Sequence, residues 1–172
     1  MKLLRFGSVG EERPGMLDAE GNIRDLSDIV SDIDGHVLGA KMLSWLADID
    51  VTTLPVVPGD VRLGPCVGQP GKFICIGLNY ADHAAETNAQ IPEEPVVFMK
   101  ATSALSGPND PVVRPRGSVK LDWEVELAFV VAEECRYLDE AAAARAIAGY
   151  FVCNDVSERA FQLERGGQWD KG

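Results

Sequence analysis

The sequence predicts an α+β protein in which a small α/β N-terminal domain, residues 1–65, precedes a strand-rich domain, residues 66–172. Three observations support this prediction. Short extended segments give way to a helical repeat before residue 50, prolines and glycines then accumulate, and apolar runs of strand length dominate the remainder.

The first domain combines strands with a helix. Residues 2–6 and 15–26 predict short strands, with Asp18 to Gly21 as a hairpin turn. From Ile33 to Ile49 apolar residues recur every three or four positions, which predicts one helix or two short ones. Prolines and glycines between Thr52 and Gly71 predict an interdomain connection, with the boundary near residue 65.

The second domain alternates short helices with strands. Residues 72–77, 96–100 and 150–155 predict strands, of which the first and last are expected to be buried. Asn79 and Asp82 begin a short helix that carries His83 and Glu86. A second helix is predicted from 138 to 147, with Asp139 as N-cap and Gly149 as the stop signal.

A central apolar run, LDWEVELAFVV at 121–131, contains two carboxylates. On a strand, Glu124 and Glu126 share one face with Ala128 and Val130, because alternate side chains point the same way. Adjacent like charges repel unless they are hydrated, share a proton or hold a cation. The run is therefore either an edge strand with a wet face or part of a cation site.

Composition limits the classes of partner. A formal net charge of −11, with only 16 Lys and Arg, argues against binding to nucleic acid or to an acidic membrane surface. The four cysteines show no C-x-x-C spacing, which favours a reducing cytoplasm and no zinc site. Neither a signal peptide nor an apolar run of membrane-spanning length is visible, so we expect a cytoplasmic protein.

Two other groups of polar residues leave alternatives open. His83 and Glu86, spaced i and i+3, are either a surface pair or a catalytic dyad. Asp155 follows an apolar strand, where it either caps the next helix or is displayed as a functional acid.

Four ordered motifs carry a family resemblance: GLNYADHAAE at 77–86, KATSALSGPNDPV at 100–112, DWEVELAFVV at 122–131 and GYFVCNDVSERAFQ at 149–162. Together they resemble the fumarylacetoacetate hydrolase family, in particular its bacterial acylpyruvate and 2,4-diketo-3-deoxy sugar acid hydrolases. The match runs from about residue 70 to the end, and the N-terminal module resembles the small domain of bacterial members.

The resemblance implies a mixed β-sandwich-like roll that holds one Mg²⁺ or Mn²⁺. It implies three metal ligands, a catalytic dyad that activates water, and residues that bind the substrate: respectively Glu124, Glu126 and Asp155; His83 and Glu86; Arg159, Gln162 and Lys100. Carboxylates and water are the ligands that a hard cation prefers.

The implied activity is hydrolysis of a carbon–carbon bond in a 1,3-dicarbonyl acid, an acylpyruvate or a 2,4-diketo sugar acid, through an enolate held at the metal. The substrate is a small anionic oxo acid, and the family suggests a homodimer. The same residues would also suit a 2-oxo acid decarboxylase, an isomerase or a lyase, because each reaction passes through an enolate.

Two departures from the family pattern affect these expectations. Glu158 and Ala160 stand where the motif commonly has Ala and Asp. The family also has a lysine four residues beyond a tryptophan that matches Trp169, a position just past Gly172. These features suggest the N-terminal portion of a longer enzyme, truncated within its catalytic domain, and a non-catalytic metal-binding fragment is the alternative. We expect the 172-residue chain alone to be inactive and poorly soluble, because unpaired strand edges recruit other chains.

Overall fold

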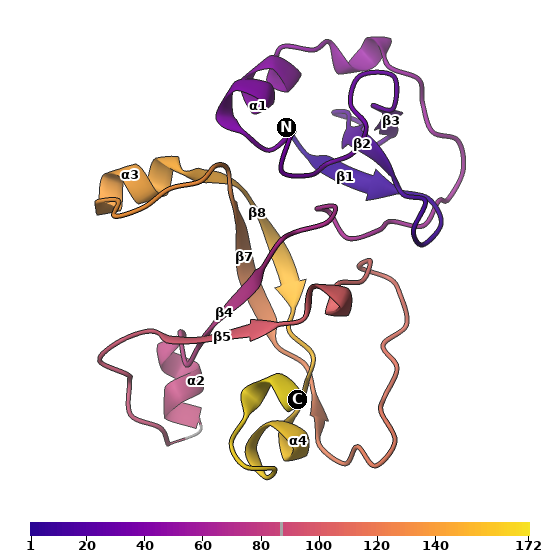
Figure 1. Ribbon diagram of the computed structural model, residues 1–172. Coiled ribbons are helices and arrows are strands. Elements are labelled where there is room, and N and C mark those ends of the chain that lie inside the picture. Colours follow the sequence, from indigo (N-terminus) through magenta and orange to yellow (C-terminus); the bar gives the residue numbers. More distant parts are fainter. Residues whose placement is uncertain (87) are drawn as a thin grey trace. The chain divides into compact units, whose positions relative to one another are not determined.

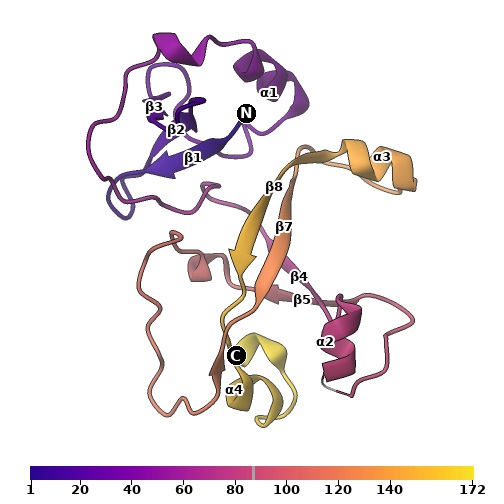
Figure 2. The ribbon, with the colours of Figure 1, turned by 180° about the vertical axis from the view of Figure 1, so that it is seen from behind.

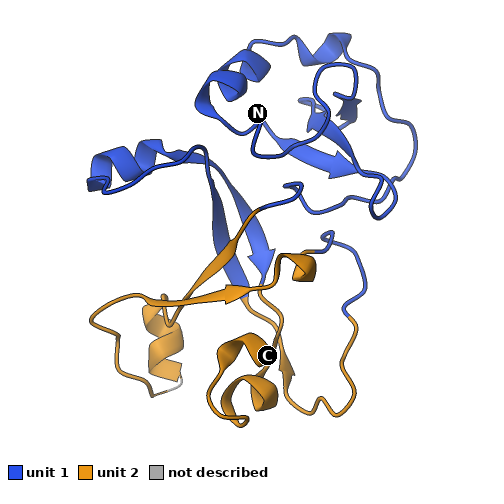
Figure 3. Ribbon diagram, in the orientation of Figure 1, with its two compact units in different colours: residues 1–70, 106–112, 125–154 blue, residues 71–105, 113–124, 155–172 orange. Residues whose placement is uncertain are grey.

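The computed structural model describes residues 1–86 and 88–172, which divide into two compact units (Figure 3). Unit 1 comprises residues 1–70, 106–112 and 125–154, and unit 2 comprises residues 71–105, 113–124 and 155–172. The elements of unit 1 are β1 (Leu3–Phe6), β2 (Arg13–Leu17), β3 (Ile23–Asp25), α1 (Ala40–Ala47), η1 (Val51–Thr53), β7 (Val125–Val131), α3 (Glu140–Arg145) and β8 (Ile147–Asn154). Those of unit 2 are β4 (Phe73–Gly77), α2 (Ala81–Glu86), β5 (Val96–Lys100), η2 (Thr102–Ala104), β6 (Leu121–Asp122), β9 (Ser157–Glu158), α4 (Arg159–Leu163) and η3 (Trp169–Lys171).

Short helices and antiparallel strand pairs make up both units. The described strands pair as β1-β2-β3, β4-β5, β6-β9 and β7-β8, all antiparallel. No helix in residues 1–86 and 88–172 has the length and apolar character needed to cross a membrane. The α+β class and the N-terminal hairpin are thus as expected, whereas the boundary near residue 65 stays a prediction.

In the N-terminal part of unit 1, the ribbon shows the short sheet of β1, β2 and β3 and the helix α1 (Figure 1). Apolar side chains of this part form a core. Leu26, Ile33 and Leu46 are almost fully buried there, and Val130 of β7 and Ala148 of β8 pack against the same cluster. The predicted helical repeat becomes a single helix, α1, which begins at Ala40 after a stretch of turns and bends over residues 31–39. Apolar burial therefore joins segments that are about 100 residues apart in the sequence.

The turn between β2 and β3 is held by the buried carboxylate of Asp18. Its oxygens accept hydrogen bonds from Asn22 N at 2.8 Å, from Asn22 Nδ2 at 3.0 Å and from Arg24 Nε at 2.8 Å. Burial alone would raise the pKa of Asp18, but the bonds from Asn22 and Arg24 outweigh it and lower the pKa to about 2.

We predict that the Asp18 carboxylate makes the free energy of unfolding depend on pH in the acid range. Because the folded pKa lies below the unfolded value of about 3.9, the stabilisation is complete above pH 4 and is lost as the pH falls towards 2. Thermal unfolding at pH 7, 4 and 2.5 measures this. Asp18→Asn should have a lower melting temperature than wild type at pH 7, and the gap between the two melting temperatures should be smaller at pH 2.5. The exposed Asp28→Asn is the control, and an equal pH profile in both variants would contradict the prediction.

The pairing of β7 with β8 confirms the period of two in the run at 121–131. Glu126, Ala128 and Val130 lie on the less exposed face, and Val130 reaches the core cluster. The opposite face is apolar and exposed, and Phe129 pairs edge-on with Tyr150 on it, with centroids 6.5 Å apart. The prediction that 150–155 is a buried strand is wrong for this face, because Val152 is 78% exposed.

The predicted boundaries of the second helix also need correction. Asp139 is the N-cap as expected, and its carboxylate accepts a hydrogen bond from Ala142 N at 2.7 Å. The helix, however, ends at Arg145, and Gly149 lies within β8 opposite Val130. Pairing with β7 therefore overrides the local helical preference of the alanine-rich segment.

Strands β4 and β5 form a two-stranded sheet in unit 2, and they too are exposed on one face. Ile74 is 54% exposed, so the expectation of a buried strand at 72–77 is wrong for that face. The C-terminal segment lies against this sheet, where Trp169 meets Phe98 edge-on with centroids 5.2 Å apart. A side chain at Gly77 would overlap the Trp169 ring, which explains the glycine at this position.

Candidate active site

Two of the predicted metal ligands, Glu124 and Asp155, lie in unit 2 together with the predicted substrate-binding residues, close to the pairing of β6 with β9. The register places Leu121 opposite Glu158 and Asp122 opposite Ser157. Just beyond this pair, Asp155 N donates a hydrogen bond of 2.8 Å to Glu124 O. This local pairing brings two of the predicted metal ligands, Glu124 and Asp155, next to each other although 31 positions separate them in the sequence.

Asp155 forms an ion pair with Lys100, which is the last residue of β5. Both side chains are largely buried, with exposures of 16% for Lys100 and 12% for Asp155. Asp155 Oδ1 is buried and, within residues 1–86 and 88–172, accepts no hydrogen bond, although the Lys100 ammonium contacts it. The alternative that Asp155 caps the next helix is excluded, because the N-cap of α4 is Glu158.

Arg159, the first residue of α4, has all three guanidinium nitrogens engaged. Nε donates to Asp122 Oδ2 at 3.0 Å, and Nη1 donates to Gln162 Oε1 at 3.0 Å. Nη2 donates to Glu124 Oε1. Gln162 is only 5% exposed, so in this structure it orients Arg159 and does not line an open surface. A guanidinium has five N–H donors, so these bonds do not use its full capacity.

The third predicted ligand, Glu126, lies on β7 in unit 1, half-buried opposite Cys153. Within the described part of the chain, no group of three or more His, Cys, Asp or Glu side chains is arranged to hold a metal ion. The donor chemistry at Asp155 nevertheless fits a hard cation, because a buried carboxylate oxygen without a hydrogen bond is costly unless a positive charge satisfies it. Lys100 supplies that charge in this structure.

The predicted dyad lies on α2, which starts two residues later than the predicted helix start at Asn79. His83 is half-buried and Glu86 is exposed, and one turn of helix separates them. Asp82 accepts a hydrogen bond from the His83 backbone N–H at 2.9 Å, which places the acid in the first turn, as expected.

Sequence reasoning missed two members of the cluster. Asp122, which holds Arg159 Nε, has the same period of two as Glu124 and Glu126, and that spacing could have identified it. Glu158 was noted only as a departure from the motif, yet it is one of the most buried carboxylates, at 3% exposure. No local pattern signals it, because glutamate is not a preferred N-cap residue.

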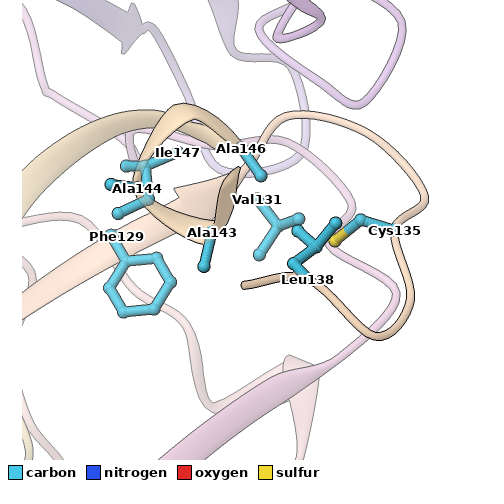
Figure 4. A pocket seen from close by; sticks show the side chains of 8 residues that line it. All are labelled: Phe129, Val131, Cys135, Leu138, Ala143, Ala144, Ala146 and Ile147. Atoms are coloured by element: carbon cyan, nitrogen blue, oxygen red, sulfur yellow. The ribbon is translucent and has the colours of Figure 1, made fainter. Parts of the chain in front are cut away.

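An apolar hollow in unit 1 has a different character (Figure 4). It has a volume of about 240 Å³, and its walls come from β7, α3 and the segment between them. Its lining residues are Phe129, Val131, Cys135, Leu138, Ala143, Ala144, Ala146 and Ile147. Because no carboxylate, histidine or basic side chain lines it, this hollow does not match the site predicted from the sequence.

Comparisons with known proteins agree with the motifs. The family model described as fumarylacetoacetate (FAA) hydrolase C-terminal matches residues 72–172. A curated protein from Burkholderia ambifaria (strain MC40-6), whose name suggests a hydrolase and gives no substrate, is 60% identical over 172 residues. That alignment covers 100% of this chain and 61% of the relative, so the chain spans less than two thirds of the relative's length.

Solved structures with the same fold include enzymes that act on different substrates. A fumarylacetoacetate hydrolase from Exiguobacterium antarcticum is 33% identical, with a TM-score of 0.78, over 96% of this chain and 59% of that one. A maleylpyruvate hydrolase from Sphingobium sp. SYK-6, in complex with manganese(II) and pyruvate, is 26% identical, with a TM-score of 0.73, over 92% of this chain and 60% of that one.

Proposed function

Because the chain belongs to the fumarylacetoacetate hydrolase family, we propose that the protein hydrolyses a carbon–carbon bond in a 1,3-dicarbonyl acid with the help of a divalent cation. The substrate class is an acylpyruvate or a 2,4-diketo sugar acid. The neighbour from Sphingobium, which contains manganese and pyruvate, supports both the cation and the product class.

The observation that carries this proposal is the pairing of two carboxylates with two cations in unit 2. Asp155 contacts Lys100, and Glu124 contacts Arg159. Such a site has oxygen donors for Mg²⁺ or Mn²⁺ and positive side chains for an anionic substrate. The local cations also offset the field of a chain whose net charge is −11.

Each residue in the proposal has a stated task. Glu124, Glu126 and Asp155 would hold the cation, which when bound supplies a Lewis acid for the 2-oxo acid end of the substrate. Arg159, oriented by Gln162, would bind the substrate carboxylate with the donors that its present partners leave available. Lys100 would bind the same end of the substrate once the cation replaces it at Asp155.

The dyad of His83 and Glu86 would remove a proton from the attacking water. Glu86 would orient His83, and His83 would take a proton from a water molecule that attacks the carbonyl distal to the carboxylate. The bond between that carbonyl carbon and the neighbouring methylene then breaks, and protonation of the methylene carbon gives a carboxylic acid and a pyruvate-type product.

We predict that the intact protein, in contrast to the 172-residue chain alone, releases pyruvate from short acylpyruvates in the presence of Mg²⁺ or Mn²⁺. A coupled assay for pyruvate across a panel of acyl groups measures this, and chelation should abolish the signal. Binding of Mn²⁺ without turnover of any member would contradict the hydrolase. Conversion of a dienol acid without cleavage, or loss of CO₂ from a 2-oxo diacid, would instead identify an isomerase or a decarboxylase.

A further inference from the structure

Glu158 is a buried carboxylate for which the proposed chemistry has no use. It is the last residue of β9 and the N-cap of α4, and only 3% of it is exposed. An ionised carboxylate at such a position is costly unless its oxygens are fully hydrogen-bonded. The free-energy cost of burying this carboxylate must therefore be offset by the contacts of its oxygens.

The two oxygens of Glu158 bind two different segments. Oε1 accepts from Val119 N at 2.9 Å, from Lys120 N and, more weakly, from Ser118 Oγ at 3.4 Å. Oε2 accepts from Phe161 N, in the first turn of α4, at 2.8 Å. Burial by itself would raise the pKa of Glu158, but these donors outweigh it and lower the pKa below its usual range. The carboxylate therefore stays ionised and joins residues 118–120 to α4.

These two segments carry Arg159 and one of its acceptors. Arg159 begins α4, and its backbone N–H also donates to Lys120 O at 2.9 Å. Asp122, which accepts from Arg159 Nε, belongs to β6, the strand that begins directly after the segment that Glu158 holds. In both ribbon views α4 lies beside the short strand β6 (Figures 1 and 2). Glu158 thus holds the first turn of α4, which carries the Arg159 side chain, and the segment that leads to its partner Asp122.

We propose that Glu158 is a positioning residue that sets the direction of the Arg159 guanidinium. Its consequence for catalysis rests on the proposed function, in which Arg159 binds the carboxylate of the substrate. Loss of the Glu158 bonds would then weaken binding of that carboxylate more than it slows the chemical step.

The substitution Glu158→Gln tests this with little change of shape. An amide has one acceptor oxygen, so it can satisfy residues 119 and 120 or Phe161, but not both. In either orientation its NH₂ group faces a backbone N–H. A matched control is Glu164→Gln, which removes the same charge from the exposed C-terminal end of α4, where Glu164 pairs with Lys120 Nζ.

Two measurements on the Mg²⁺-loaded protein distinguish positioning from stability. The first is the NMR signal of Arg159 Nε–H, the group that donates to Asp122. The second is the Kd for pyruvate from calorimetry. In Glu158→Gln we expect the signal to shift or disappear and the Kd to rise about 10- to 100-fold, as for other orienting partners. Glu164→Gln should leave the Arg159 signal in place and change the Kd by less than about twofold. In Glu158→Gln, but not in Glu164→Gln, KM should rise by a larger factor than kcat falls.

An unchanged Arg159 signal in Glu158→Gln, with only a lower melting temperature, would overturn the proposal and make Glu158 structural. If the signal is lost but wild-type protein binds no pyruvate, the positioning of Arg159 is upheld and the proposed function fails. Should Glu158→Gln not fold, Ser118→Ala removes only the weakest of the donors. A smaller shift of the same signal is expected there, and its absence would again overturn the proposal.

Discussion

In the full-length protein, His83→Ala is expected to lower kcat by about 10²- to 10⁴-fold and to leave the melting temperature nearly unchanged. Under the proposed function, His83 removes the proton from the attacking water, so its loss removes general base catalysis. Its contribution to stability should be small, because α2 has only six residues and Ala84 is its single buried residue. Steady-state kinetics and thermal unfolding of the same preparation measure both effects.

The chain offers a matched control, because it contains only two histidines. His36 is exposed and lies in unit 1, where it lines an open groove with Trp45 and Lys41. His36→Ala should therefore keep wild-type kcat. A large loss of stability in His83→Ala with activity retained would make His83 and Glu86 a structural pair.

Glu126→Gln is expected to weaken binding of Mn²⁺ or Mg²⁺ by more than about 100-fold. Loss of a residue that only orients a metal ligand costs about 10- to 100-fold, and loss of a ligand itself should cost more. The reason is that Gln keeps the shape of the side chain but removes one of three negative charges that the proposed site gives to the cation. Calorimetric titration of the metal measures the change without any need for turnover.

Glu134→Gln controls for the general loss of negative charge. Glu134 pairs with Arg136 and its side chain is 82% exposed, so metal affinity should not change in this variant. Equal affinities in wild type and Glu126→Gln would place the cation elsewhere, and a parallel titration of Asp155→Asn would then show whether Asp155 still contributes.

Local sequence determined several elements directly. The hairpin at Asp18, the strand at 96–100, the cap at Asp139 and the period of two around Glu126 all follow from interactions within a few residues. Turn chemistry, capping and side-chain alternation act over this range, so a single sequence contains the information. The roles of the candidate residues came instead from the resemblance of four local motifs to a known family.

Tertiary structure alone decided which residues meet. The pairing of β8 with β7 ended α3 early and placed Gly149 in a strand, against its local preference. Asp155 lies 55 positions from its partner Lys100, and the two carboxylates that bind Arg159 lie 35 and 37 positions from it. Glu158 likewise binds residues 38 to 40 positions earlier in the chain. Such contacts depend on the free energy of burying charged groups together, which no spacing in the sequence reveals.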